Sequence, residues 1–314
     1  MDTPLLTVET LAYNHAPYIR QCIEGILMQK TTFPFELLIH DDASPDGTAD
    51  IIREYETRYP DIIKPIYQTE NQNLKKGHIA DNILLSRTRG KYTAVCEGDD
   101  YWTDPLKLQK QVDFLETHLD YTICGARVGI LYPGNTDTVP DWMTDMSKYP
   151  KGKTISLDDF LEPFSFHLQT ICYRTDCFGV EKLNLFEYLY DQTYFAILLE
   201  QGKGFVFPDY FGVYRVHQGG AWSGKTYEEQ QRFSEPFFYE MVQHFGSKSK
   251  SIRKRYFEYC INLRFIELRE SKQFIIDCLK IVRFAFLGKI RDVISFQIPY
   301  LFHKSRQSFI RIYK

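Results

Sequence analysis

The sequence has no apolar run of the roughly 18–20 residues that a membrane-spanning helix needs, and its first residues, Met1 to Pro4, carry no basic cluster. We therefore expect neither a transmembrane helix nor a signal peptide. The seven cysteines are an odd number, without C-x-x-C spacing and without a neighbouring histidine cluster. This pattern argues against a disulfide framework or a zinc site and favours a reducing compartment.

The composition is that of a globular chain with an uneven charge distribution. Of its 314 residues, 44% are hydrophobic and 16% are aromatic, which is enough for a sizeable core and excludes a disordered chain. The net charge of −3 conceals a basic segment, residues 246–314, with 16 Lys/Arg against 5 Asp/Glu. The remaining part is acidic, so it is a poor partner for nucleic acid, although it could bind a nucleotide through a metal ion.

The first hundred residues alternate between apolar strand patterns and helix patterns. We predict strands at residues 5–11, 35–40, 62–67 and 92–95, separated by three amphipathic helices. This rhythm predicts a largely parallel sheet with right-handed crossovers. No G-x-G-x-x-G follows the first strand, so a dinucleotide-binding Rossmann domain loses its main support.

The following segment continues the pattern less regularly. A helix through Leu108, Val112 and Leu115 precedes predicted strands, and another helix is predicted over residues 187–201. The predicted strands cover residues 121–132, 164–173 and 204–207. Residues 133–153 are rich in Pro, Gly, Asp and Lys, which is typical of either a mobile loop that closes over a ligand or a plain surface insertion.

Carboxylates cluster where two of the predicted strands end. Glu97, Asp99 and Asp100 follow the strand at 92–95, and Asp41-Asp42 ends the strand at 35–40. A lone Asp-Asp pair is more often a solvated turn, but ligands of open α/β sheets bind at the carboxyl ends of strands. Clustered carboxylates repel each other unless a cation lies among them, and oxygen ligands suit Mg²⁺ or Mn²⁺ shared with a phosphate. The sequence therefore predicts a divalent metal and a phosphorylated ligand.

Taken together, these motifs resemble an inverting family 2 glycosyltransferase of the GT-A fold, of the bacterial polysaccharide type. The motifs are Tyr13-Asn14-His15, Asp41 to Thr48, Glu97 to Asp100, Gly77, Asn82, Gly90-Lys91-Tyr92 and Tyr214 to His217. They extend over about the first two thirds of the chain. Each motif alone is a weak signal, whereas their order and spacing together are a specific one.

The resemblance implies a nucleotide site and a metal site. Thr10 or Leu11, Tyr13 and Asp42 match positions that hold a uracil-like base, and Asp99 matches a ribose contact. Asp100 and His217 match metal- or diphosphate-contacting positions, whereas Glu97 replaces the usual first acid of a D-x-D pattern. Arg215, Trp102 and His167 are further candidates for supporting roles. Taken alone, Tyr13 is more often a core tyrosine, and a lone His217 more often a satisfied structural histidine.

Asp191 matches the position of the catalytic base, in Leu189-Tyr190-Asp191-Gln192. The preceding Tyr190 departs from the family, which often has Glu or Gly there. The alternative is that Asp191 only stabilises a helix N-terminus, an effect of about 0.3–1 kcal/mol. We favour the catalytic interpretation, in which this carboxylate deprotonates an acceptor sugar hydroxyl and the configuration inverts.

The resemblance implies an enzyme that transfers a sugar from a nucleotide diphosphate donor, which we expect to be a UDP-sugar. The expected cofactor is Mn²⁺ or Mg²⁺. We predict a catalytic domain over residues 1–245, with a nucleotide half (1–102) and an acceptor half (103–245), and a basic helical region over 246–314. That region either contacts an anionic membrane, which would favour a lipid-linked acceptor at the inner face of the plasma membrane, or packs on the catalytic domain. The expected location is cytoplasmic, with no nucleic-acid partner. A nucleotidyltransferase, which would need a Gly-rich basic loop after the first strand, and a non-catalytic sugar-nucleotide binding protein are the alternatives.

Overall fold

The computed structural model describes residues 3–72, 78–140, 146–159, 166–219 and 225–269. The chain divides into two compact units, Met1–Tyr259 and Cys260–Lys314, and the sheet lies in the first. The predicted boundary after residue 245 lies between helix α7 (Tyr227–Phe245) and helix α8 (Lys250–Arg269). Most of the basic segment 246–314, and Gly77, lie outside the described residues.

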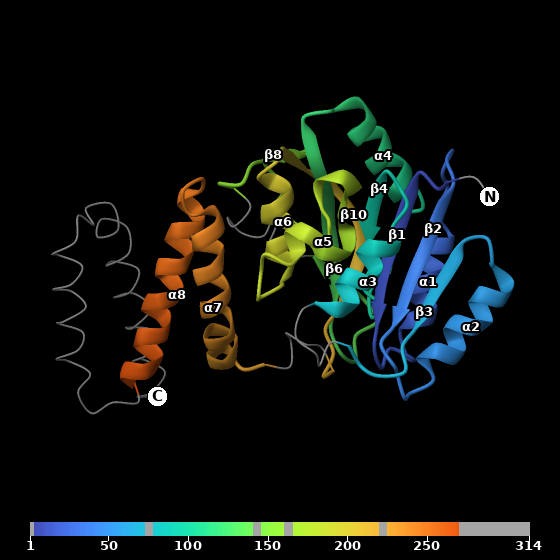
Figure 1. Cartoon of the computed structure of the whole chain (residues 1–314), viewed down its shortest axis with the longest axis horizontal. Helices are drawn as coiled ribbons and strands as arrows, with labels where there is room; N and C mark the ends of the chain where they lie inside the picture. Colours follow the sequence, from blue (N-terminus) through green and yellow to red (C-terminus); the bar gives the residue numbers. More distant parts are fainter. Residues whose placement is uncertain (1–2, 73–77, 141–145, 160–165, 220–224, 270–314) are drawn as a thin grey trace. The chain divides into compact units, whose positions relative to one another are not determined.

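The first half of the sheet is parallel, as the alternating pattern predicts (Figure 1). Its strands run in the order β3-β2-β1-β4, and each neighbouring pair is parallel. Their bounds are Leu6–Ala12 for β1, Phe35–Asp41 for β2, Ile63–Tyr67 for β3 and Tyr92–Val95 for β4. Helices α1 (Ile19–Leu27), α2 (Thr48–Arg58) and α3 (Ile79–Arg87) connect them, so the carboxyl ends of these strands meet at one edge.

The second half of the sheet is mixed rather than parallel. It continues β4-β9-β6-β10-β5, where β9 (Cys172–Arg174) is antiparallel to both neighbours and β10 (Lys203–Arg215) is parallel to β6 (Tyr121–Leu131). The short strands β5 (Tyr101–Trp102), β7 (Val139–Pro140) and β8 (Lys153–Ile155) pair antiparallel with β10, β6 and β10.

Two predictions for this half are wrong in their extent. The strand predicted over 164–173 is a 3-10 turn at Leu168–Thr170 followed by β9, and its first two residues lie outside the described part of the chain. The strand predicted over 204–207 is longer: β10 continues to Arg215, with register irregularities between Val206 and Gly212. Those irregularities break the alternation that sequence analysis relies on.

Helices cover both faces of the sheet. One core cluster joins α1, α2 and α4 (Lys107–Thr117) to the strands, through residues such as Ile23, Tyr55 and Leu108. On the opposite face, Leu84 of α3 packs with Leu38 of β2. Also on that face, α5 (Val180–Leu183), α6 (Asp191–Leu199) and α7 contribute to a second large cluster. The structure is therefore a three-layer α/β/α arrangement.

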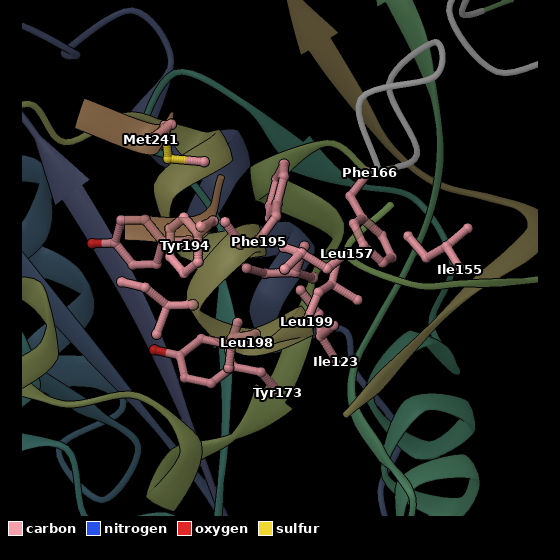
Figure 2. Close-up of a cluster of buried hydrophobic side chains, with 14 of the residues drawn as sticks. Ile123, Ile155, Leu157, Phe166, Tyr173, Tyr194, Phe195, Leu198, Leu199 and Met241 are labelled. Carbon is pink, nitrogen blue, oxygen red and sulfur yellow. The ribbon is translucent and has the colours of Figure 1, made fainter. Parts of the chain in front are cut away.

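Helix α6 is buried on all sides in this second cluster (Figure 2). Residues Thr193 to Leu199 are all buried, and they pack against Ile123 of β6, Tyr173 of β9 and Met241 of α7. A helix that is apolar all round has no amphipathic stripe, which explains why its start was predicted at residue 187 instead of Asp191. Its polar first residue, Asp191, is exposed.

A lysine is buried in the first cluster. Lys107 is 0% exposed, its Nζ donates to Gln111 Oε1 at 2.7 Å and lies 3.8 Å from the centre of the Trp102 ring. Burial lowers the pKa of Lys107 from its ordinary value of 10.5 to about 8, although the neighbouring thiols of Cys172, Cys96 and Cys124 act in the opposite direction.

No helix among the described residues is long and apolar enough to span a membrane.

We expect Lys107→Met to change how stability depends on pH. Between the lowered pKa of folded Lys107 and the ordinary pKa, the unfolded chain binds more protons, so this lysine makes stability rise with pH. Relative to the variant, the wild type should gain about 2 kcal/mol in unfolding free energy from about pH 7.5 to 9.5. Urea denaturation at both pH values measures this difference. Parallel pH curves for the two proteins would contradict it.

Candidate active site

The loops that follow β1 and β2 are bound to each other at the carboxyl edge of the sheet. The backbone N–H groups of Asn14, His15 and Ala16 donate to Ser44 Oγ, Thr48 Oγ1 and Asp46 Oδ2 at 3.0, 2.9 and 3.0 Å. Asn14 and Ala43 have positive φ angles of 58° and 61°, so both loops turn sharply. The two motifs that the sequence places after separate strands therefore form one rim.

Asp42 lies buried at this rim. It is 1% exposed, its backbone N–H donates to Ala12 O at 2.9 Å, and its Oδ1 accepts from the Gln72 N–H at 2.6 Å. Leu11 and Tyr13 come from the end of β1 beside it, and Tyr13 is 40% exposed. Thr10 is fully buried, which leaves Leu11 as the more accessible of the two predicted positions.

The acidic segment after β4 folds tightly onto the end of β1. The Gly98 N–H donates to Leu11 O at 3.0 Å. A Cβ atom at Gly98 would lie 2.7 Å from His15 Nδ1 and 2.9 Å from Leu11 O, so only glycine fits. The closeness of this contact fixes the positions of the flanking acids, Glu97 and Asp99.

Asp100 is held by Arg215, at the end of β10. The Arg215 backbone N–H donates to Asp100 Oδ1 at 2.8 Å, and the guanidinium donates to Asp99 O at 2.5 Å. Tyr101 lies under the same guanidinium, 4.4 Å from its carbon to the ring centre. Asp100 Oδ2 is buried and has no hydrogen-bond partner among the described residues. Burial, together with the charge of Asp99, raises the pKa of Asp100 well above its ordinary value.

Two histidines lie around the carboxylate of Asp99. His217 Nε2 is 3.0 Å from Asp99 Oδ2, and His15 Nε2 is 3.8 Å from the same oxygen. Burial lowers the pKa of His15, while Asp99 opposes this change. Arg215 and His217 thus join the acidic segment, as the sequence predicts for residues of one site.

A cavity of about 520 Å³ opens beside the acidic segment. Glu97 and Asp191 both line it, together with Leu11 and with Gln72, whose backbone binds Asp42. The structure therefore brings the proposed base to the acidic segment, although the two are 94 positions apart in the chain. Nucleotide-binding candidates lie at the rim and Asp191 lies on the wall.

Asp191 is the first residue of α6, and its position is fixed by the helix start. The Tyr190 N–H donates to Thr193 Oγ1 at 3.2 Å, and the Thr193 N–H donates back to Tyr190 O at 2.8 Å. Although Asp191 is exposed, the protein around the cavity removes water from its carboxyl group and raises its pKa, and nearby His167 opposes this change. His167 also contacts Tyr214, with 5.6 Å between the ring centres.

The carboxylates act on each other. Burial raises the pKa of Glu97 well above its ordinary value, and the charges of Asp191, Asp99, Asp100 and Asp81 raise it further. Burial also raises the pKa of Tyr214, and the charges of Asp100, Glu97, Asp99 and Asp191 raise it further. Four candidate residues from two segments, Glu97 to Asp100 and Asp191, therefore share one electrostatic environment.

One candidate lies elsewhere, and two residues were missed. Trp102 is 1% exposed, its Nε1–H donates to Gln169 O at 2.7 Å and Lys107 covers its ring, so its side chain belongs to the core. Glu9 and Asp81 line the cavity but were not predicted. A carboxylate in the middle of the apolar strand Leu6–Ala12 was the available signal for Glu9.

The residues fit a divalent cation that is shared with a ligand, rather than a complete protein cage. Among the described residues, no group of three or more His, Cys, Asp or Glu side chains forms a ready metal site. The buried Asp100 Oδ2 has an unused acceptor, and the Asp99 carboxylate lies on the adjacent residue. Mg²⁺ and Mn²⁺ are commonly held by one or two carboxylates plus phosphate oxygens, which matches this donor set.

The sequence matches known proteins over most of its first unit. The profile of the family described as Glycosyl transferase family 2 matches residues 7–179. An uncharacterized protein of Mycobacterium tuberculosis is 34% identical over 237 residues, which are 73% of this chain and 64% of the relative. TuaG of Bacillus subtilis, provisionally assigned to teichuronic acid biosynthesis as a glycosyltransferase, is 37% identical over 112 residues, covering 36% of this chain and 42% of TuaG.

The fold also matches solved structures. S. aureus TarS in complex with UDP-GlcNAc has a TM-score of 0.56 and 18% identity, covering 76% of this chain and 66% of TarS. The Pyrobaculum calidifontis mannosyltransferase PcManGT, in complex with GDP-Man and Mn²⁺, has a TM-score of 0.52 and 18% identity, covering 95% and 85%. At such identities these structures establish the GT-A fold alone. The profile match over more than half of the chain establishes that the protein belongs to glycosyl transferase family 2.

Proposed function

We propose that this chain transfers a sugar from a nucleotide diphosphate donor to an acceptor hydroxyl with inversion, and that Asp191 is its catalytic base. The observation that carries the proposal is the cavity that both Glu97 and Asp191 line. In a single displacement, the leaving diphosphate lies on one side of the anomeric carbon, and the attacking hydroxyl with its base lies on the other. A donor anchored at the acidic segment would place its sugar in this cavity, within the range of about 300–1,000 Å³ usual for ligand pockets.

The base needs a deprotonated carboxylate that faces the acceptor. Asp191 is exposed at a fixed helix start, and α6 is locked in the core by its apolar residues. These features suit a residue that must take a proton at a defined position. The Asp191 carboxylate would accept the acceptor's proton while the hydroxyl oxygen forms the new glycosidic bond and the bond to the diphosphate breaks.

The leaving diphosphate requires neutralisation. Asp100 would hold Mn²⁺ or Mg²⁺ through its buried Oδ2, and Asp99 and His217 would complete the surroundings of that ion or of the ribose. When bound, such an ion supplies positive charge to the departing phosphate oxygens. The Arg215 N–H keeps Asp100 oriented toward the site. PcManGT, a structural neighbour, is solved with GDP-Man and Mn²⁺, which supports a metal-dependent reaction.

The donor nucleotide would lie along the rim formed by Leu11, Tyr13 and Asp42. The ring of Tyr13, which is 40% exposed, can stack on a base. Asp42 is buried and its Oδ1 already accepts from the Gln72 N–H, so a base N–H would have to approach its second carboxylate oxygen. TarS is solved with UDP-GlcNAc, which supports a UDP-sugar, and TuaG supports a role in cell-surface polysaccharide assembly. A cytoplasmic location, a lipid-linked acceptor and membrane contact through residues 246–314 remain part of this proposal.

Asp191→Asn should abolish nearly all transfer while leaving nucleotide affinity unchanged. A positioned base typically contributes about 10²–10⁴-fold in rate, and asparagine keeps the shape but cannot accept the proton. Turnover with a panel of UDP- and GDP-sugars, and calorimetry with UDP, measure the two quantities. Glu200→Gln, at the other end of α6, is the matched control and should behave as wild type. Activity of Asp191→Asn within a few-fold of wild type would exclude Asp191 as the base.

The pH profile should report the same carboxylate. Because the pKa of Asp191 is raised, the fraction of active, deprotonated base falls as pH decreases through a value above the usual aspartate pKa of about 3.9. We expect kcat to fall on the acid side at that higher pH, and the residual rate of Asp191→Asn to lack this limb. Nucleotide binding measured over the same pH range separates loss of the base from loss of the metal.

Asp100→Asn should remove the metal dependence of nucleotide binding. Asparagine can still accept from the Arg215 N–H but supplies no negative oxygen to a cation. The loss of UDP affinity at a fixed Mn²⁺ concentration should exceed the 10–100-fold typical of residues that only orient a ligand. Asp113→Asn, an exposed position on α4, controls for the charge change. An unchanged Mn²⁺ effect on UDP binding would place the metal elsewhere.

A further inference from the structure

The cavity is also lined by acids to which the proposed reaction assigns no role. Glu9 comes from β1 and Asp81 from α3, and both line the same cavity as Glu97 and Asp191. Glu187, four residues before Asp191, is a fifth carboxylate on the wall. These five acids come from four separate parts of the chain, so the cavity is acidic through its tertiary construction rather than through one local cluster.

Among the described lining residues there is no lysine or arginine. His78 is the remaining titratable base on the wall, and its Nε2 is 2.9 Å from Phe186 O. A carbonyl oxygen only accepts, so this nitrogen must donate its proton to the backbone. The described wall therefore offers an anionic ligand neither a cationic side chain nor that histidine N–H.

Glu9 and Asp81 are fixed by hydrogen bonds. Glu9 is 5% exposed and accepts from the Thr88 hydroxyl, and Asp81 Oδ1 accepts from the Tyr194 hydroxyl at 2.7 Å. Burial raises the pKa of Glu9 to about 7. The hydrogen bond from Thr88 opposes this change, whereas the charge of Asp81 adds to it. At neutral pH the Glu9 carboxyl can thus either donate to or accept from a hydroxyl group.

The same cavity carries aromatic walls. Tyr188 and Tyr190 line it, and the backbone N–H of Tyr188 donates to Glu240 Oε2 of α7 at 3.0 Å, which fixes this segment. Aromatic rings with a few convergent polar groups are typical of small-ligand sites. Carboxyl groups beside rings provide both the apolar faces and the hydrogen-bonding atoms that a sugar ring presents.

We propose that Glu9 and Asp81 restrict the donor to a neutral or amine-bearing sugar and exclude a sugar acid. This inference rests on the proposed function, because the donor sugar must extend from the acidic segment and Asp191 into the cavity. A carboxylate on the sugar would face the carboxyl oxygens of Glu9 and Asp81 and lose its hydration without gaining a cation from the described lining residues. Hydroxyl or amine groups at the same place would instead donate to these oxygens.

Matched donor pairs that differ only in oxidation at C6 test the inference. Calorimetry with Mn²⁺ compares UDP-glucose with UDP-glucuronic acid, and GDP-mannose with GDP-mannuronic acid. Above the pKa of about 7 of Glu9, its carboxylate is charged. At about pH 8.5 we therefore expect, for the pair whose nucleotide binds, that the neutral sugar binds about tenfold more tightly or better, because like-charge contacts in a closed site are costly. Equal affinity of both members for the wild type would overturn the inference.

Variants connect the discrimination to the two residues. Glu9→Gln and Asp81→Asn, singly and combined, should bring the affinities of the pair closer together by improving the sugar acid. Asp50→Asn, an exposed position on α2, makes the same charge change outside the cavity and should leave the ratio unchanged. The affinity for the nucleotide alone verifies that each variant is folded.

The outcomes separate the two proposals. If the nucleotide binds but the ratio is the same in wild type and variants, the inference about Glu9 and Asp81 is wrong and the proposed function stands. If neither UDP, GDP nor any of the four nucleotide sugars binds in the presence of Mn²⁺, the proposed function fails and the inference fails with it.

Discussion

Repulsion between carboxylates is the constraint on which the site depends. The charges of Asp191, Asp99 and Asp100 raise the pKa of Glu97, and that of Asp99 raises the pKa of Asp100. Such crowding is unfavourable and persists because the fold enforces it. The enforcement comes largely from the backbone. The Gly98 N–H binds the end of β1, and the Arg215 N–H binds Asp100, so the acids cannot move apart without breaking these contacts.

The packing of α6 performs the same task for Asp191. Seven consecutive residues of this helix, Thr193 to Leu199, are buried, and they pack with β6, β9 and α7. Their burial anchors a helix whose first residue is exposed. The stability of this core therefore determines the position of a carboxylate in the cavity, which links packing energy to the geometry of the proposed reaction.

Strand β10 connects the two halves of the sheet to the site. It pairs with β6 along most of its length and with β5 directly after the acidic segment. Its last residue, Arg215, and the nearby His217 consequently reach Asp99 and Asp100 from more than a hundred positions away in the chain. The register irregularities between Val206 and Gly212 lie between the part of β10 that pairs with β8 and the part that pairs with β5, and they concealed the single strand in the sequence.

The sequence by itself determined the parallel half of the sheet and the residues at its carboxyl edge, because alternating βα units and motif spacing are local signals. It predicted Asp42, Asp99, Asp100, Asp191 and His217 as site residues. The structure places Asp191 on the cavity wall, Asp42 against the lining residue Gln72, and His217 against Asp99 in the acidic segment next to the lining residue Glu97. Only the tertiary structure decided that Trp102 belongs to the core and that Glu9 and Asp81 face the cavity. Which wall a side chain faces depends on strand order and on helices packed from distant segments, and no local pattern of residues encodes these contacts.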